Sequence, residues 1–388
     1  MTSSTNSTRR THRTSPFARA LTCAESTPPG YRPGLPQPPL RVDDPGTLIA
    51  ALPAMLGFVP ERSLVAAVLR GTGAPGPTAI EAVVRFDLDS ITDPWRRDRF
   101  TACLGSICLR EQAVGVLVVI VDDRMADGAD VLCAATLIEA LGTEGVAVRG
   151  AWSVPTIAAG SRYRNLSDPR DSGIVGDPGA SPVAVAQVVD GRQIRRSRGE
   201  LTALVRADRQ RCARVRTRIG PAVARYRAGL TAAARAGRAV AFQRNALEWV
   251  LWQIADAASG EPRADRELAR LAATLRDRPI RDAMYGLALT DHAEAAEQLW
   301  AQLARATPGV DRAEAAALLG FSAYLRGDGP FAGVALSAAV HADATHPMAV
   351  LLETSLQSGL RPERLRRLAR CGHQIAADLG VDIGPIDL

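Results

Sequence analysis

The chain has 388 residues, of which 47% are hydrophobic and only 4% aromatic, and it carries a formal net charge of +6 with a pI of about 9.3. This length exceeds one typical domain, so we expect at least two domains with substantial cores. No apolar run approaches the roughly 20 residues of a membrane-spanning helix, so we expect no membrane contact. All 47 basic residues are arginine, which is typical of a GC-rich genome and weakens the net charge as evidence for phosphate binding.

The first 39 residues are rich in arginine, serine and proline, and no apolar core of a signal peptide follows Arg9-Arg10. We interpret 1–39 as a disordered extension. A start codon assigned too far upstream would look the same, so the sequence does not decide whether 1–39 is expressed. None of the six cysteines forms a C-x-x-C pair. Reduced, unlinked cysteines predict a cytoplasmic protein.

Residues 40–190 predict an α/β domain. Asp44 suits a helix N-cap and Pro45 a first helical position, and apolar residues then recur at helical spacing. Pro53 should kink or split this helix, and Gly57 should end it. After a turn at Pro60-Glu61, the apolar run 63–70 predicts a buried strand.

Further strands are predicted at 79–87, 113–121 and 145–154, and a short edge strand at 161–164. Helices are predicted from Asp93-Pro94 to about Arg110 and over 128–141. The first two strands suggest an antiparallel hairpin, and the strand–helix–strand unit over 113–154 predicts a parallel crossover. Residues 165–182 read as a long ordered loop, and a short helix follows Ser181-Pro182. The predicted architecture is a mixed sheet with covering helices.

Residues 191–388 predict an all-α domain. Ser197 and Glu200 fit a capping box, and helices are expected over 199–218 and 221–236, separated at Gly220-Pro221, with eight more up to about 379. Gly286 and Gly320 lie 34 residues apart in similar contexts, which is the tetratricopeptide period, so we describe the hairpins as tetratricopeptide-like. Ordinary helical hairpins in an alanine-rich chain are the alternative.

Three segments together resemble the actinobacterial domain of unknown function 4192 family: DDPGTLIAALPAMLGFVPERSLV, SPVAVAQVVDG and LLGFSAYLRGDGPFAGVALSAAV. The signature positions matched here include Pro53, Gly57, Phe58, Pro60 and Ser63. The resemblance implies no activity. Many members carry cysteines in the loop after the sheet, whereas 163–173 has none here, so we predict neither a metal nor another cofactor.

Candidate catalytic residues are Asp122 and Asp123, which end a buried strand where open α/β sheets commonly bind ligands. With Asp127 and Asp130 they form a group of carboxylates that could hold a divalent cation. Strand-end solvation and helix capping explain the same residues. The chain has no lysine and so no Walker phosphate loop, and it lacks a dinucleotide-binding glycine fingerprint.

The helical half offers two candidate binding surfaces. A groove around Trp300, Phe321, Tyr324 and Phe331 could take a partner, although these aromatic residues would equally fill a core. Between Arg192 and Arg227, twelve arginines face only two acidic residues, and Arg211, Arg214 and Arg218 share one helix face as a possible anion site. Because the arginines ring the helix and Tyr226 is its only aromatic residue, the sequence disfavours nucleic-acid binding.

The function is therefore unknown from the sequence alone. The leading hypothesis is a cytoplasmic, non-enzymatic protein that binds a protein partner or a small ligand. The alternatives are an enzyme with its site at the strand ends of the α/β domain and, more weakly, arginine-mediated binding of nucleic acid.

Overall fold

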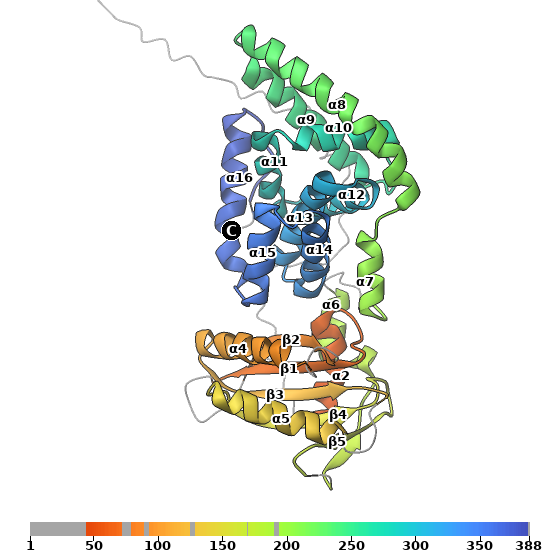
Figure 1. Ribbon diagram of the computed structural model, residues 1–388, viewed down its shortest axis with the longest axis vertical. Coiled ribbons are helices and arrows are strands. Elements are labelled where there is room, and N and C mark those ends of the chain that lie inside the picture. The colour runs from red at the N-terminus through yellow and green to blue at the C-terminus, as the bar shows by residue number, and fades with distance from the viewer. Residues whose placement is uncertain are drawn as a thin grey trace, which may run out of the picture.

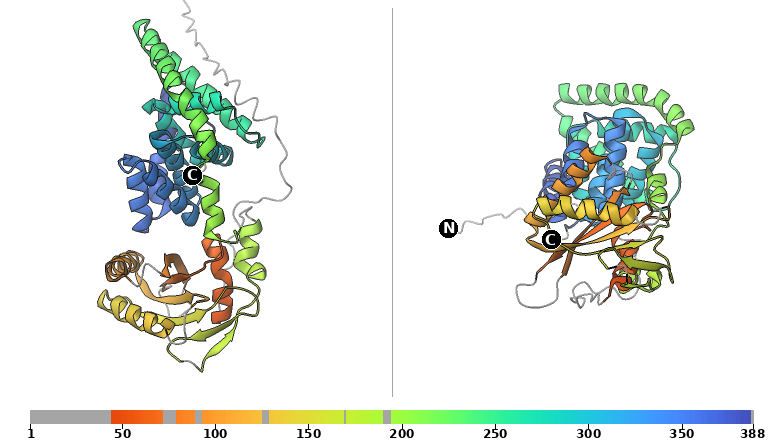
Figure 2. Two further views of the ribbon diagram at one scale, coloured as in Figure 1. Left: turned by 45° about the vertical axis from the view of Figure 1, so that its right-hand side comes forward. Right: turned by 60° about the horizontal axis from the view of Figure 1, so that its bottom comes forward.

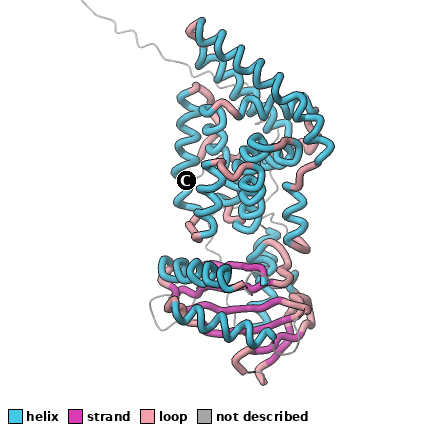
Figure 3. Tube along the Cα trace, in the orientation of Figure 1, coloured by secondary structure: helices cyan, strands magenta, loops and turns pink. Residues whose placement is uncertain are grey.

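The computed structural model describes residues 44–71, 79–88, 93–124, 129–168, 170–189 and 194–386, with the side chains of 129–133 excepted. The extension predicted for 1–39 and most of the loop predicted for 71–78 lie outside these residues. A six-stranded sheet with its helices forms one domain, and an all-helical domain stands above it (Figure 1). Figure 3 shows that the strands are confined to the lower domain.

The sheet has the strand order β2-β1-β3-β4-β5-β6, and only the β3–β4 pair is parallel. The predicted hairpin and the predicted parallel crossover are therefore both confirmed. The strands are β1 (Ser63–Arg70), β2 (Ala79–Asp87), β3 (Ala113–Val121), β4 (Val148–Val154), β5 (Arg162–Asn165) and β6 (Ser172–Ile174). The segment predicted as a loop over 165–182 contains β6 and the 3-10 turn η1 (Pro178–Ala180), so β5 is not the edge strand.

Helices cover both faces of the sheet because its central strands are apolar on both faces. Leu64, Val118 and Ile120 pack with α4 (Pro94–Arg110) and α5 (Ala129–Thr143) on one face. Val65 and Val119 pack with α2 (Pro45–Leu56) on the other face. That second cluster continues through α7 (Arg198–Val205) into the helical domain, so the two domains share an apolar core.

The residues predicted to begin and end α2 do so in the structure. The Asp44 carboxylate accepts the N–H of Thr47 at 3.0 Å, and Gly57 closes the helix in the left-handed conformation with φ of 72°. Pro53 does not split the helix, which is continuous from Pro45 to Leu56. At the start of α7, the predicted capping box does not form: Ser197 makes no side-chain cap bond, and Glu200 accepts the N–H of Arg196, one residue before the cap.

The helical domain begins with α7, which packs against α12 and α14, whereas α6 (Pro182–Val189) packs against α2 of the sheet domain. The remaining elements follow in chain order: α8 (Arg209–Arg235), α9 (Ala239–Ala257), α10 (Asp265–Leu275), α11 (Arg278–Met284), η2 (Tyr285–Leu289), α12 (Ala293–Ala306), α13 (Gly309–Leu325), α14 (Gly329–Ala342), α15 (Pro347–Gln357), η3 (Pro362–Leu365) and α16 (Arg366–Asp378).

The prediction for the first two helices of this domain is wrong in two places. The chain breaks after Val205, where Arg312 donates to the Val205 carbonyl and the Asp208 N–H donates to the Arg305 carbonyl. The chain then continues as one helix, α8, through Gly220-Pro221. Pro221 cannot donate to the carbonyl of Thr217, but both residues are exposed, so water can satisfy that carbonyl.

The tetratricopeptide-like repeat is not confirmed, because the two glycines occupy different settings. Gly286 lies in η2, where an added Cβ would come within 2.6 Å of the backbone of His373 on α16. Gly320 lies inside α13 and packs against Leu336 of α14. The 34-residue spacing therefore reflects two unrelated close approaches between helices.

Candidate functional site: a basic groove between α8, α9 and α10

Helices α8, α9 and α10 lie at the end of the helical domain farthest from the sheet (Figures 1 and 2), and side chains of all three line a groove. It encloses about 930 Å³, within the size range of small-molecule sites. We call it the α8–α9–α10 groove. Each helix contributes a stripe of residues at helical spacing: Arg218, Ala222, Arg225 and Gly229 from α8; Phe242, Asn245, Ala246 and Trp249 from α9; and Arg266, Ala269, Arg270 and Ala273 from α10.

The helices are placed by their buried stripes and by their caps. On α8, the buried residues Cys212, Val215, Ile219 and Val223 face the core, which turns the adjacent arginine stripe into the groove. The Asp208 carboxylate starts this helix by accepting the N–H of Arg211 at 2.9 Å. The groove is therefore formed by amphipathic helices whose apolar faces pack together.

The charge of the groove is strongly one-sided. Four arginines line it, and Glu267 is the only acidic residue among the described lining residues. Glu267 already accepts the N–H of Ala264 at 3.0 Å, as part of the cap of α10. Within the described part of the chain, no carboxylate lies within ion-pairing distance of the guanidinium of Arg225, Arg266 or Arg270. The groove therefore carries positive charge that the protein itself does not neutralise.

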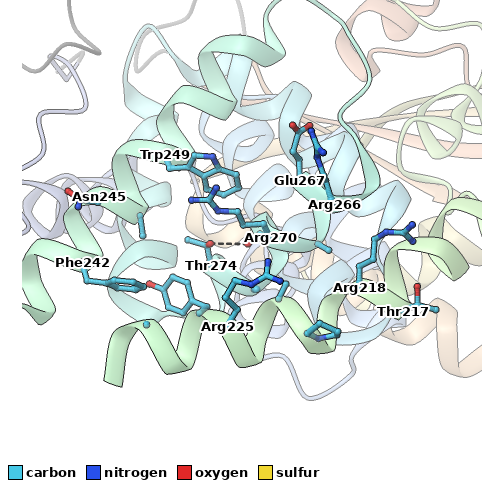
Figure 4. A pocket seen from close by; sticks show the side chains of 17 residues that line it. Thr217, Arg218, Arg225, Phe242, Asn245, Trp249, Arg266, Glu267, Arg270 and Thr274 are labelled. Atoms are coloured by element: carbon cyan, nitrogen blue, oxygen red, sulfur yellow. Dashed lines mark hydrogen bonds between the residues drawn. The ribbon is translucent and has the colours of Figure 1, made fainter. Parts of the chain in front are cut away.

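Figure 4 shows Arg225 of α8 and Arg270 of α10 directed into the same space. Burial lowers the pKa of the Arg270 guanidinium, and the positive charge of Arg225 lowers it further. Arg270 also lies over the ring of Trp249, with its central carbon 3.8 Å from the ring centroid, a cation–π contact that orients the side chain. An anion between Arg225 and Arg270 would relieve their mutual repulsion.

The aromatic end of the groove is held by specific contacts. Tyr226 and Phe242 meet edge to face with ring centroids 5.3 Å apart, and Phe242 packs over Gly229, where a Cβ would come within 2.8 Å of the ring. The Tyr226 hydroxyl donates to Asp277 at 2.7 Å, and burial together with this carboxylate raises the tyrosine pKa well above its ordinary value. Tyr226 is therefore a fixed, neutral wall of the groove.

The three arginines predicted as an anion site are only partly available. Asp265 accepts hydrogen bonds from Arg211 Nε at 3.3 Å and Arg214 Nε at 2.8 Å, and these contacts, the one from Arg214 first, lower the pKa of Asp265. Arg218 instead donates to the Arg214 carbonyl and lines the groove. Of the three arginines predicted to form an anion site, Arg211 and Arg214 therefore pair with Asp265, and only Arg218 lines the groove.

The predicted aromatic groove does not lie at a surface. Trp300, Phe321, Tyr324 and Phe331 are all buried, with at most 7% of any of them exposed. These four residues fill the helical core, which was the alternative expectation for them. The aromatic residues that do line a groove belong to α8 and α9. On α9, Phe242 and Trp249 are seven residues apart and share a helix face with Asn245 and Ala246, and this spacing is the signal that sequence reasoning missed.

The predicted catalytic aspartates lie at the end of β3, next to residues outside the described part. The Asp122 carboxylate accepts the N–H of Arg124 at 3.0 Å, and the exposed Asp123 carboxylate lies 3.8 Å from Arg124 Nε. Asp127 and the side chain of Asp130 lie outside the described residues. Among the described residues, no three metal-ligating side chains gather into a cluster.

The family signature has a structural role. Phe58 is buried and forms an isolated parallel bridge with Arg195, which ties the end of α2 to the start of the helical domain. The buried Ser63 hydroxyl donates to the Glu61 carbonyl at 2.6 Å and accepts a hydrogen bond from Arg85 at 2.8 Å. Pro53 lies inside α2 and Pro60 is buried in the turn before β1.

These features define a class of protein: a mixed α/β sheet domain followed by a helical domain that carries an open basic groove. The family model described as Domain of unknown function (DUF4192) matches residues 45–363, which is most of the chain, and the chain belongs to that family. No curated protein and no solved structure matches the chain. None of the described helices combines the length and apolar character needed to cross a bilayer.

Proposed function

We propose that this protein is a non-enzymatic binding protein that holds an anionic ligand in the α8–α9–α10 groove. One observation carries the proposal: three groove arginines have no carboxylate partner in the described structure, and two of them point into the same space (Figure 4). Uncompensated guanidinium groups that face each other destabilise the unliganded protein slightly and become favourable when an anion binds.

A contrast within the same domain supports this proposal. On the same helix α8, Arg211 and Arg214 share the acidic residue Asp265. Arg276 makes two hydrogen bonds of 2.8 Å to Asp311. All four groove arginines are exposed, as arginines placed by codon usage alone would also be. A general excess of arginine does not explain why they converge on one aromatic-walled groove.

A cytoplasmic location is part of the same proposal. Cys103, Cys108, Cys212 and Cys371 are free thiols, and a reducing compartment keeps thiols in that state. Burial raises the pKa of Cys108 and Cys212, which makes both thiols poor nucleophiles and suits a packing role.

The test measures binding of inorganic polyphosphate to the full chain by calorimetry at two salt concentrations. We expect binding that weakens with salt and that falls at least about ten-fold in the double variant Arg225→Glu/Arg270→Glu. The matched control is Arg216→Glu/Arg227→Glu, because both arginines are exposed on α8 but lie outside the groove. Equal losses in the two double variants, or no binding by the unmodified chain, would refute the groove as the site.

A further inference from the structure

The aromatic rings of the groove lie among its arginines, and this arrangement narrows the class of ligand. Resting on the anionic-ligand function proposed above, we infer that the groove binds single-stranded nucleic acid, with the arginines on the phosphates and the aromatic wall against the bases. Grooves that combine a positive track with stacking surfaces are how single strands are bound without sequence preference.

Tertiary structure supplies the aromatic surface that α8 lacks. In the chain from Arg192 to Arg227, Tyr226 is the only aromatic residue. The fold places Phe242 and Trp249 of α9 across from it, so three aromatic side chains line the groove. Trp249 is half-buried and carries the Arg270 guanidinium on its ring at 3.8 Å. Both tryptophan and arginine planes are surfaces on which unpaired bases stack.

The arginines are spread along the groove and not gathered at one point. Arg218 and Arg225 are seven residues apart on α8, which is about 10 Å along the helix, and Arg266 and Arg270 lie on the facing helix α10. The lining of α8 runs from Thr217 to Gly229, a length of about 18 Å. A single phosphate would reach only part of this track. A chain of phosphates would reach all of it.

The surroundings of the groove favour the same ligand. No acidic residue occurs between Arg209 and Arg235, the whole length of α8. Arg216 and Arg227 are exposed on α8 but do not line the groove, so the positive charge of the proposed site is that of the four lining arginines. A polyglutamate chain would pair with these arginines but has no ring to stack on the aromatic wall, so the aromatic residues decide between these ligands.

The experiment measures fluorescence anisotropy of the full chain with a labelled single-stranded oligonucleotide of about ten nucleotides, within the usual range of single-strand sites. Polyphosphate, polyglutamate and the matching duplex serve as competitors. We expect the single strand to bind more tightly than the duplex, because a duplex keeps its bases stacked on one another. The logarithm of the association constant should fall with the logarithm of salt concentration with a slope of about −3, as four phosphate contacts would give.

The decisive variant is Trp249→Ala. We expect it to lower oligonucleotide affinity about ten-fold and to lower polyphosphate affinity by clearly less, so that the ratio of the two affinities changes. Trp249→Phe should restore most of the ratio because it keeps a stacking surface. Trp252→Ala is the matched control, since Trp252 is an exposed tryptophan of α9 outside the groove.

The outcomes separate the two proposals. Polyphosphate or polyglutamate binding as tight as oligonucleotide binding, with an unchanged ratio in Trp249→Ala, would overturn the nucleic-acid inference and leave the anionic groove standing. If the unmodified chain binds none of these polyanions, both the anionic-ligand proposal and the nucleic-acid inference are overturned. A circular dichroism melt of each variant establishes that the loss does not come from unfolding.

Discussion

The α8–α9–α10 groove and the contact between the two domains are both rich in arginine, but they use it differently. At the domain contact, Arg361 donates to Glu111 at 3.0 Å, and Arg110 donates to the carbonyls of Ser358 and Gly359 at 2.5 and 2.6 Å. In the groove, Arg225 and Arg270 both point into the space between the helices and have no carboxylate partner among the described residues. The same residue type stabilises the assembly of the domains in one place and leaves charge for a ligand in the other.

Aromatic residues show the same contrast. Trp300 is fully buried between helices of the core, whereas Trp249 is half-buried at the edge of the groove with an arginine on its face. Residue type alone therefore does not distinguish a structural position from a binding position. The difference lies in what surrounds each side chain, and substitutions at paired and unpaired positions test it.

The largest expected effect is that of Trp300→Ala. Removing a fully buried tryptophan should lower the free energy of unfolding by about 3–5 kcal/mol, because it loses apolar burial and leaves a cavity. Trp249→Ala should cost about 1 kcal/mol, since its ring is only partly removed from water. Urea denaturation followed by circular dichroism measures both. Equal losses would show that Trp249 is a core residue and that the groove has no free aromatic wall.

The second largest expected loss of stability comes from a substitution at the contact between the two domains. Glu111 is 7% exposed and accepts hydrogen bonds from Arg110 at 3.2 Å and Arg361 at 3.0 Å. Glu111→Ala should lower the free energy of unfolding by about 2–3 kcal/mol, because two guanidinium groups lose a largely buried partner. Glu81→Ala is the control: Glu81 also contacts Arg361 but is more exposed, so we expect a loss below about 1 kcal/mol.

The pH dependence of this contact follows from the same pair. Hydrogen bonds from Arg361 and then Arg110 hold the pKa of Glu111 below its ordinary value of 4.5. The folded pKa is lower than the unfolded one, so the stabilisation is present above about pH 4.5 and is lost as the pH falls through the folded pKa. The stability difference between the unmodified chain and Glu111→Gln should therefore shrink below pH 4.5. A constant difference would contradict this assignment.

The smallest expected effect is an increase in stability, whereas the substitutions above lower it. Arg225→Gln should leave stability unchanged or raise it by up to about 0.5 kcal/mol, because it removes the repulsion between Arg225 and Arg270. The same change at Arg276, which pairs with the buried Asp311, should destabilise the protein. Thermal melts of the two variants compare them directly. A loss of stability in Arg225→Gln would mean that this arginine has a structural partner.

Much of the architecture could be predicted from the sequence, because it depends on neighbouring residues. The Asp44 and Asp93 caps, the glycine stop at Gly57 and the apolar strands all act over a few residues, and each lies where the pattern places it. The parallel β3–β4 pair follows from the length of the helix between the strands. Of the candidate site, Arg218 and Tyr226 were singled out in advance.

Only the tertiary structure decided which of these residues work together. Arg211 and Arg214 are committed to Asp265, more than fifty residues away, and the groove needs Trp249 and Arg270 from two other helices. A helical period states which residues share a face but not which helix that face meets. The sequence therefore determined the elements and the excess of arginine, and the packing of α8 against α9 and α10 decided where that positive charge stays unpaired.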